Sequence, residues 1–223
     1  MTRHTVRLKG RSNPIAVGKI VCIGRNYVDH INELDNIRPD SPMFFIKPAT
    51  SLAPLEKPIR IPEYSEKARH ELELAVILDK PLVRCREDEV YGAVGGYAVA
   101  LDVTLQDVQE RCKERGHPWE IAKAFDGACP ISDFVPASAV ADPQNLTMTM
   151  RVNGVLRHDG NTRLMIWSIP AVVAAASRYF TLDPGDIILT GTPAGVGPLE
   201  EGDVLDMEIQ DIGVFKSSVG PPR

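Results

Sequence analysis

The chain has no apolar run near the ~20 residues that a membrane-spanning helix needs, and no apolar signal core follows its basic N-terminal residues. None of the four cysteines lies in a Cys-x-x-Cys pair, which excludes a zinc knuckle and a thioredoxin-like motif. Positive charge is not in excess, because the net charge is -5, and this argues against a nucleic-acid-binding surface. We therefore expect a cytoplasmic protein with reduced cysteines that binds neither membrane nor nucleic acid.

The apolar runs that are present are short, and 17 glycines and 18 prolines interrupt them. This pattern is typical of strands joined by turns rather than of a helical bundle. Strands are predicted at 19–23, 43–46, 71–78, 96–103, 146–152, 186–190 and 204–209. Asn153-Gly154 predicts a two-residue hairpin turn, because both residues tolerate a positive φ.

Fewer segments have helical periodicity. A helix is predicted over 104–115, with Thr104 and Asp107 as a capping box and Gly116 at its end. Two more are predicted over 170–179 and, as a short element, over 27–34. The sequence thus indicates a β-rich α+β protein, with an N-terminal arm over 1–17 and one large domain over 18–223.

Carboxylates alternate with leucines at the start of the predicted strand 71–78. Glu71 and Glu73 share one strand face, about 7 Å apart by the rise per residue. On the strand 96–103, Asp102 shares a face with two small residues, Ala98 and Ala100, which leave room beside it. Three carboxylates repel one another unless a cation neutralises them, and an all-oxygen set selects Mg²⁺, Mn²⁺ or Ca²⁺ rather than Zn²⁺. The alternative is a half-exposed strand with a solvated acidic face.

A histidine and a glutamate lie three residues apart in the short helix predicted over 27–34. His30 and Glu33 are neighbours on a helix surface, where the carboxylate would orient the imidazole as a general base for water. So short a helix is not stable alone, which suits a lid that orders over substrate. The alternative is an ordinary surface pair.

Several motifs occur together in one order: CIGRNY (22–27), FIKP (45–48), HELELA (70–75), LDVT (101–104), DVQ (107–109), AKAFD (122–126) and LTGTPAGVG (189–197). In this order they resemble the fumarylacetoacetate hydrolase family over about residues 18–210. The resemblance implies a mixed β-sandwich roll, usually dimeric, so we expect a homodimer. The chain length is similar to the short branch of acylpyruvate hydrolases and oxaloacetate decarboxylases or tautomerases. One departure is Asp35-Asn36, where many relatives have glycine after the lid.

The resemblance also implies roles for individual residues. It places a divalent metal on Glu71, Glu73 and Asp102, a general-base pair at His30 and Glu33, and a catalytic lysine at Lys123. Substrate contacts are implied for Arg25, Lys47, Gln109 and Thr192. The stretch 191–197 lacks Gly-Lys-Ser/Thr and is not a phosphate loop; it favours a turn that brings Thr192 and backbone N–H groups to a carboxylate.

The expected function is therefore that of a Mg²⁺- or Mn²⁺-dependent enzyme acting on a small 2-oxo acid through a metal-stabilised enolate. The first hypothesis is hydrolysis of a carbon–carbon bond in an acylpyruvate. The second is oxaloacetate tautomerisation or decarboxylation, or isomerisation of a 2-hydroxyhepta-2,4-diene-1,7-dioate in aromatic catabolism. The third is a non-enzymatic metal- or ligand-binding protein. Since a simple binder needs no base, the presence of His30, Glu33 and Lys123 argues against the third.

Overall fold

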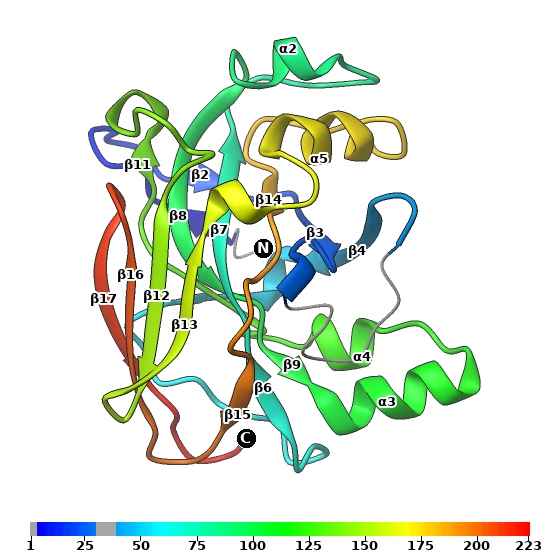
Figure 1. Cartoon of the computed structure of the whole chain (residues 1–223), viewed down its shortest axis with the longest axis vertical. Coiled ribbons are helices and arrows are strands. Elements are labelled where there is room, and N and C mark those ends of the chain that lie inside the picture. The colour runs from blue at the N-terminus through cyan, green and yellow to red at the C-terminus, as the bar shows by residue number, and fades with distance from the viewer. Residues whose placement is uncertain (1–3, 30–38) are drawn as a thin grey trace.

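A computed structural model describes residues 4–29 and 39–223 of the chain, and Figure 1 shows its arrangement. Its largest sheet is mixed. Parallel pairs join β3 to β14 and β10 to β5, whereas the other neighbours are antiparallel. The strand order is β4 (Met43–Pro48), β3 (Lys19–Gly24), β14 (Ile187–Leu189), β7 (Leu72–Leu78), β8 (Val94–Leu101), β10 (Cys129–Ile131) and β5 (Leu52–Pro54), with β11 (Val135–Pro136) also paired to β8.

An antiparallel sheet packs against the largest one and lies to the left in Figure 1. Its order is β13 (Val155–Asn161), β12 (Thr147–Val152), β16 (Val204–Ile209) and β17 (Gly213–Ser218). A small sheet joins β15 (Gly197–Leu199), β6 (Ala68–His70) and β9 (Thr104–Leu105), and an N-terminal hairpin joins β1 (Thr5–Val6) to β2 (Ile15–Ala16). This β-rich architecture is the expected fold class.

The described helices are few and short. They are α2 (Glu87–Val90), α3 (Gln106–Arg115), α4 (Glu120–Lys123) and α5 (Ile169–Ala176), with single 3₁₀ turns η1 (Ala49–Ser51), η2 (Ala137–Ala139) and η3 (Thr162–Leu164). Figure 1 shows α3 and α4 together at one side of the largest sheet, away from α5. No helix in the two described ranges has both the length and the apolarity of a membrane span.

The central strands are buried on both faces, and their side chains alternate as the sequence predicts. On β7, Leu72, Leu74 and Val76 belong to the cluster that the antiparallel sheet covers. Ala75 and Ile77 point the other way, into a cluster that the N-terminal hairpin helps to cover. The small residues of β8 face this second side, which is also the side of Glu73 and Asp102.

Most predicted elements are confirmed within one or two residues, including the hairpin, where Asn153 and Gly154 have φ of 50° and 78°. The predicted capping box is wrong. Thr104 lies in β9, and its hydroxyl donates to Glu71 Oε1 at 2.7 Å instead of capping the helix. Asp107 accepts a hydrogen bond from Ser65 Oγ at 2.7 Å, so α3 begins at Gln106 without a side-chain cap. Most of the short helix predicted over 27–34 lies outside the described residues.

Candidate active site

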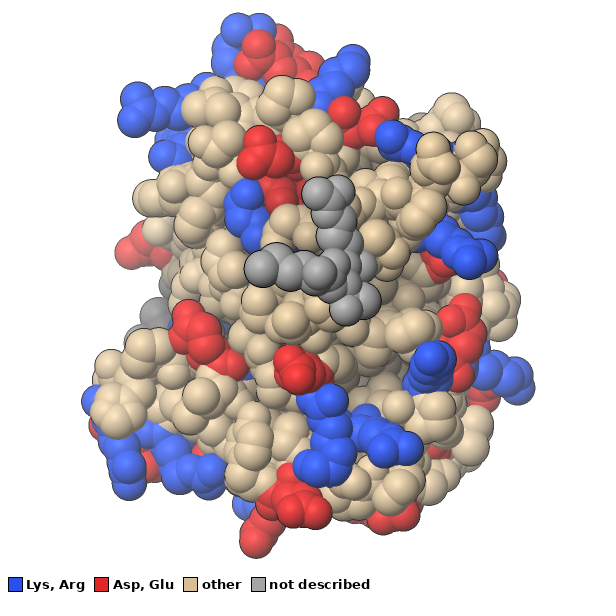
Figure 2. All heavy atoms as spheres, turned by 180° about the vertical axis from the view of Figure 1, so that it is seen from behind, with Lys and Arg blue, Asp and Glu red and all other residues tan. Residues whose placement is uncertain are grey.

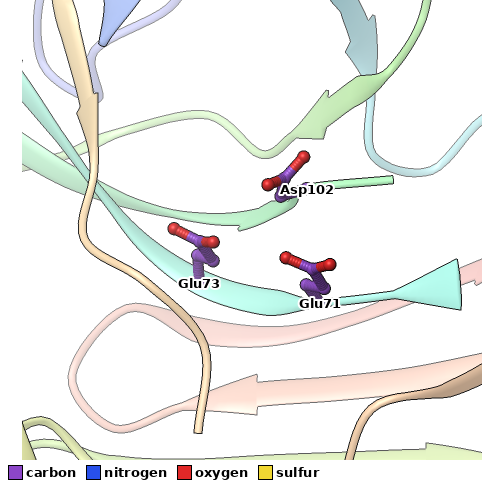
Figure 3. Close-up of side chains that lie close together, drawn as sticks. All are labelled: Glu71, Glu73 and Asp102. Atoms are coloured by element: carbon purple, nitrogen blue, oxygen red, sulfur yellow. The ribbon is translucent and has the colours of Figure 1, made fainter. Parts of the chain in front are cut away.

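Three carboxylates converge where β7 and β8 run side by side. Each of Glu71, Glu73 and Asp102 offers an oxygen that lies within 4.8 Å of the other two. Figure 3 shows the three side chains projecting to the same side of the neighbouring strands. Glu73 and Asp102 are each only 1% exposed, and Glu71 is partly buried. Three negative charges this close in a dehydrated place need cations nearby.

Lys123, at the end of α4, supplies one positive charge. Its Nζ lies 2.6 Å from Asp102 Oδ2 and 3.0 Å from Glu71 Oε2, and it donates to Thr104 Oγ1 at 2.6 Å. Burial lowers the pKa of Lys123, but the carboxylates of Asp102 and Glu71 outweigh it and raise the pKa above its usual range. The ammonium therefore stays charged.

Lys47, on β4, supplies a second charge at the other oxygen of Asp102. Its side chain is fully buried, and its Nζ lies 2.7 Å from Asp102 Oδ1. The ammonium also donates to the backbone carbonyls of Lys123 and Ala128, so Asp102 Oδ1 shares this cation with two neutral acceptors.

Glu73 is the least compensated of the three carboxylates. Burial raises its pKa well above the usual range, and the charges of Asp102 and Glu71 raise it further. One backbone donor opposes this effect, since Gly191 N–H donates to Glu73 Oε2 at 2.6 Å. A buried carboxyl group in this condition gains from any cation that approaches it.

The residues fit a hard divalent cation. Two lysines face three carboxylates, so the negative charge of the cluster is incompletely compensated by these lysines. The nearby thiols do not compete as ligands, because burial raises the pKa of Cys22 and raises that of Cys129 to about 12, which keeps both protonated. An all-carboxylate set of this kind is typical of Mg²⁺, Mn²⁺ or Ca²⁺.

A pocket opens over the carboxylates, and most of the predicted site residues meet there. Its lining includes Glu71, Glu73, Asp102, Lys123, Arg25, Gln109 and Thr192. Lys47 was predicted to contact substrate, but it lies behind the carboxylates and is not in the pocket lining. His30 and Glu33 lie outside the described residues, and their roles stay predictions.

The sequence analysis missed an aromatic wall in the same pocket. Phe45 on β4 and Trp119 beside α4 pack with ring centroids 6.4 Å apart. Lys123 Nζ lies 5.1 Å from the Phe45 centroid, and Lys113 Nζ lies 5.4 Å from the Trp119 centroid. For Lys113 the sequence did contain a signal, because this lysine is four residues after Gln109 and the two therefore share a face of α3.

Glycines allow the 189–197 loop to close tightly against the site. Gly191 has a φ of 91°, and a Cβ there would lie 2.8 Å from the Cβ of Asn26. Asn26 in turn is fully buried and donates to Thr190 O at 2.9 Å. The carboxylate that this loop meets in the protein is that of Glu73, through the Gly191 amide.

Two buried histidines connect this loop to the strand that leads into the carboxylates. His158 Nδ1 lies 2.9 Å from Ala194 O, which only accepts, so Nδ1 carries a proton. His158 Nε2 then accepts from His70 Nδ1 at 3.1 Å. Burial, followed by the charges of His158 and Arg157, lowers the pKa of His70 to about 3 and keeps it neutral. The pair therefore ties Glu71 and the Thr192 loop to β13.

Known proteins resemble this chain over most of its length. The model of the fumarylacetoacetate hydrolase C-terminal family matches residues 19–220. Bovine mitochondrial oxaloacetate tautomerase FAHD1 is 46% identical over 207 residues, covering 92% of both chains. Escherichia coli oxaloacetate tautomerase YcgM is 49% identical over 190 residues, or 85% of this chain and 87% of that one. Fumarylpyruvate hydrolase from Pseudomonas aeruginosa, solved with Mn²⁺ and pyruvate, superposes with a TM-score of 0.93 at 34% identity, covering 99% and 98%.

Proposed function

Because this chain belongs to the fumarylacetoacetate hydrolase family, we propose that it is a divalent-metal-dependent enzyme of small 2-oxo acids, and that its reaction is oxaloacetate tautomerisation. The observation that carries the proposal is the cluster of Glu71, Glu73 and Asp102, whose ligand oxygens lie within 4.8 Å of one another beside a charged lysine. The relatives that carry the tautomerase name favour this alternative over acylpyruvate hydrolysis.

The three carboxylates would hold Mg²⁺ or Mn²⁺. The bound ion would polarise the 2-oxo group and stabilise the negative charge that develops on its oxygen when the neighbouring carbon loses a proton. Lys123 keeps its proton because of Asp102 and Glu71, so it would add a fixed positive charge beside the bound substrate. Tautomerisation transfers one proton between that carbon and the 2-oxo oxygen, and loss of the enol is the transfer from oxygen to carbon.

Other described residues of the pocket hold the substrate in place. Gln109 presents an amide from α3, and Thr192 presents a hydroxyl from the loop beside Glu73. Both can donate hydrogen bonds to a substrate carboxylate. Since a carboxylate and a 2-oxo group lie on adjacent carbons, fixing one of them fixes the other, and this orientation supplies part of the rate enhancement.

A direct test follows the enol absorbance of oxaloacetate in the presence of the protein. With Mg²⁺ or Mn²⁺ we expect its decay to accelerate without release of CO₂ or pyruvate, and chelation with EDTA should abolish the acceleration. Release of pyruvate and CO₂ at the same rate would instead identify a decarboxylase. No metal-dependent change with either readout would reject the proposal.

Acylpyruvate hydrolysis is the second candidate. It is supported by the similarity to fumarylpyruvate hydrolase, whose structure contains Mn²⁺ and pyruvate. Hydrolysis differs from tautomerisation in needing an activated water molecule, which is the predicted task of His30 and Glu33. Incubation with acetylpyruvate and fumarylpyruvate, followed by a pyruvate assay, separates the two reactions.

A further inference from the structure

A lysine outside the motifs lies at the outer end of the pocket. Lys113 is on α3, one turn beyond Gln109, which places it about 6 Å further along the helix by the rise per residue. Its Nζ lies 5.4 Å from the Trp119 centroid, whereas Lys123 Nζ lies 5.1 Å from Phe45 at the carboxylate end. The aromatic wall therefore has an ammonium group at each end.

The two ammonium groups differ in their partners. Lys123 forms ion pairs with Glu71 and Asp102. Lys113 forms no ion pair with any residue in the described ranges. Two of the three acidic residues of its own helix have other partners, since Glu110 accepts from Gln106 and Asp107 pairs with Arg111.

The surroundings of Lys113 favour an anion. Lys113 is exposed at the edge of the pocket, but desolvation by the surrounding protein lowers its pKa, and the positive charges of Arg25 and Lys123 lower it further. An anionic group bound beside Lys113 would relieve this repulsion. Contact with Trp119 limits where the ammonium can go, so the position is partly preorganised.

We propose that Lys113 binds the second carboxylate of the substrate and so selects 2-oxo dicarboxylates over 2-oxo monocarboxylates. The inference rests on the proposed function for the position of the 2-oxo acid group, which occupies the Glu71, Glu73 and Asp102 end of the pocket.

The kinetic test compares Lys113→Gln with wild type on a dicarboxylate, oxaloacetate, and on a monocarboxylate, acetylpyruvate. We expect Lys113→Gln to raise KM for oxaloacetate about tenfold, as loss of one charge-assisted contact at a partly exposed site should, with little change in kcat. KM for acetylpyruvate should change less than twofold. Lys113→Arg should recover most of the oxaloacetate affinity. Arg115→Gln, which removes a charge from the same helix outside the pocket lining, is the control.

A binding test does not depend on turnover. Calorimetry of the Mg²⁺-loaded protein with malate, an unreactive dicarboxylate, and with lactate, which lacks the second carboxylate, should show tighter binding of malate to wild type. Lys113→Gln should remove that preference, and thermal unfolding of the variant should match wild type if the Trp119 contact is dispensable. This preference can hold even if oxaloacetate is not turned over, so failure of the proposed function is seen separately.

Two results would overturn the inference. One is an equal loss of affinity for dicarboxylates and monocarboxylates in Lys113→Gln, which would mean that the lysine only braces α3 against Trp119. The other is no preference of the wild-type protein for malate over lactate together with an unchanged KM for oxaloacetate in the variant.

Discussion

Two buried carboxylate sites in this protein differ in how completely the chain satisfies them. Asp186, before β14, is 1% exposed and accepts backbone N–H groups from Lys19 at 3.0 Å and Asp183 at 2.8 Å, in addition to the Lys19 ammonium. Glu73 is equally buried, but it has one backbone donor and two carboxylates as neighbours. Donors within the described chain compensate the charge of Asp186, whereas the charge of Glu73 would be stabilised by a further cation.

This difference separates a structural carboxylate from one that is arranged for binding. Gly18 shows how closely the first site is packed, because a Cβ there would lie 2.7 Å from Asp186 Oδ1. At the second site the neighbouring strand instead carries Ala98 and Ala100, whose small side chains leave space beside Asp102. A buried carboxylate alone therefore does not indicate a metal site. A buried carboxylate whose negative charge is incompletely compensated by nearby donors and cations does.

The largest expected effect is that of Glu73→Gln on metal binding and turnover. Losing a direct ligand should weaken Mg²⁺ binding by more than the roughly 10–100-fold that loss of an outer-shell partner costs, and turnover should fall with it. Calorimetric titration with Mg²⁺ or Mn²⁺ and the oxaloacetate assay measure the two quantities. Glu208→Gln, at an exposed position of β16, is the matched control. Normal metal affinity in Glu73→Gln would remove the metal site.

Asp186→Asn should have the opposite pattern. Breaking the buried pair with Lys19 should lower the free energy of unfolding by ~3 kcal/mol, because the ammonium loses its partner. Activity per folded molecule should not change.

Without metal, Glu73→Gln should be as stable as wild type or more stable, because it removes an under-compensated charge. Urea unfolding measures both, and Asp206→Asn, in a more exposed ion pair, should cost less than 1 kcal/mol.

His158→Leu should cost about 2 kcal/mol of stability, because Ala194 O and the His70 Nδ1–H lose their partner in a buried place. His158→Gln offers one donor and one acceptor and should restore most of that loss. If the pair also positions Glu71 and the Thr192 loop, His158→Leu should weaken Mg²⁺ binding even when affinity is measured well below the melting temperature of the variant. Equal metal affinity in the Leu and Gln variants would restrict the pair to a structural role.

The smallest effect is a pH dependence of the metal-free protein. The pKa of Glu73 is higher in the folded than in the unfolded chain, so the folded state binds more protons between the two values. Stability contributed by Glu73 is therefore full below the ordinary glutamate range and is lost as pH rises toward the raised pKa, by at most ~1.4 kcal/mol per pH unit. Melting curves from pH 4 upward should show a steeper decline for wild type than for Glu73→Gln. Parallel curves would contradict this reasoning.

Local patterns account for much of the predicted fold and site. The Glu/Leu alternation of β7 and the small residues of β8 place Glu73 and Asp102 on one side, because side chains alternate along a strand. The capping box at Thr104 failed because its hydroxyl has a tertiary partner, Glu71 Oε1, that sequence spacing cannot show. Lys47 behind the carboxylates and Lys113 beside Trp119 depend on contacts between distant segments in the same way.

The net charge of the protein could be predicted from the sequence, but the positions of its charged side chains on the surface could not. The sequence has a net charge of -5, and on the face shown in Figure 2 basic and acidic side chains are interspersed. The pocket, in contrast, collects Arg25, Lys113 and Lys123 from segments nearly 100 residues apart in the chain. Such a concentration arises only when the chain folds, because Arg25 follows β3 whereas Lys113 and Lys123 are on α3 and α4.

The amino-acid order by itself determined the strand periodicity, the Asn153-Gly154 turn and the identity of the acidic residues, since each depends on neighbours within a few positions. Tertiary structure alone decided how well each buried charge is compensated. Asp186 and Glu73 are both acidic residues beside strands, and only the folding of distant donors around one and of further carboxylates around the other makes them different. Electrostatic energy in a dehydrated interior depends on distances in space, which local sequence does not fix.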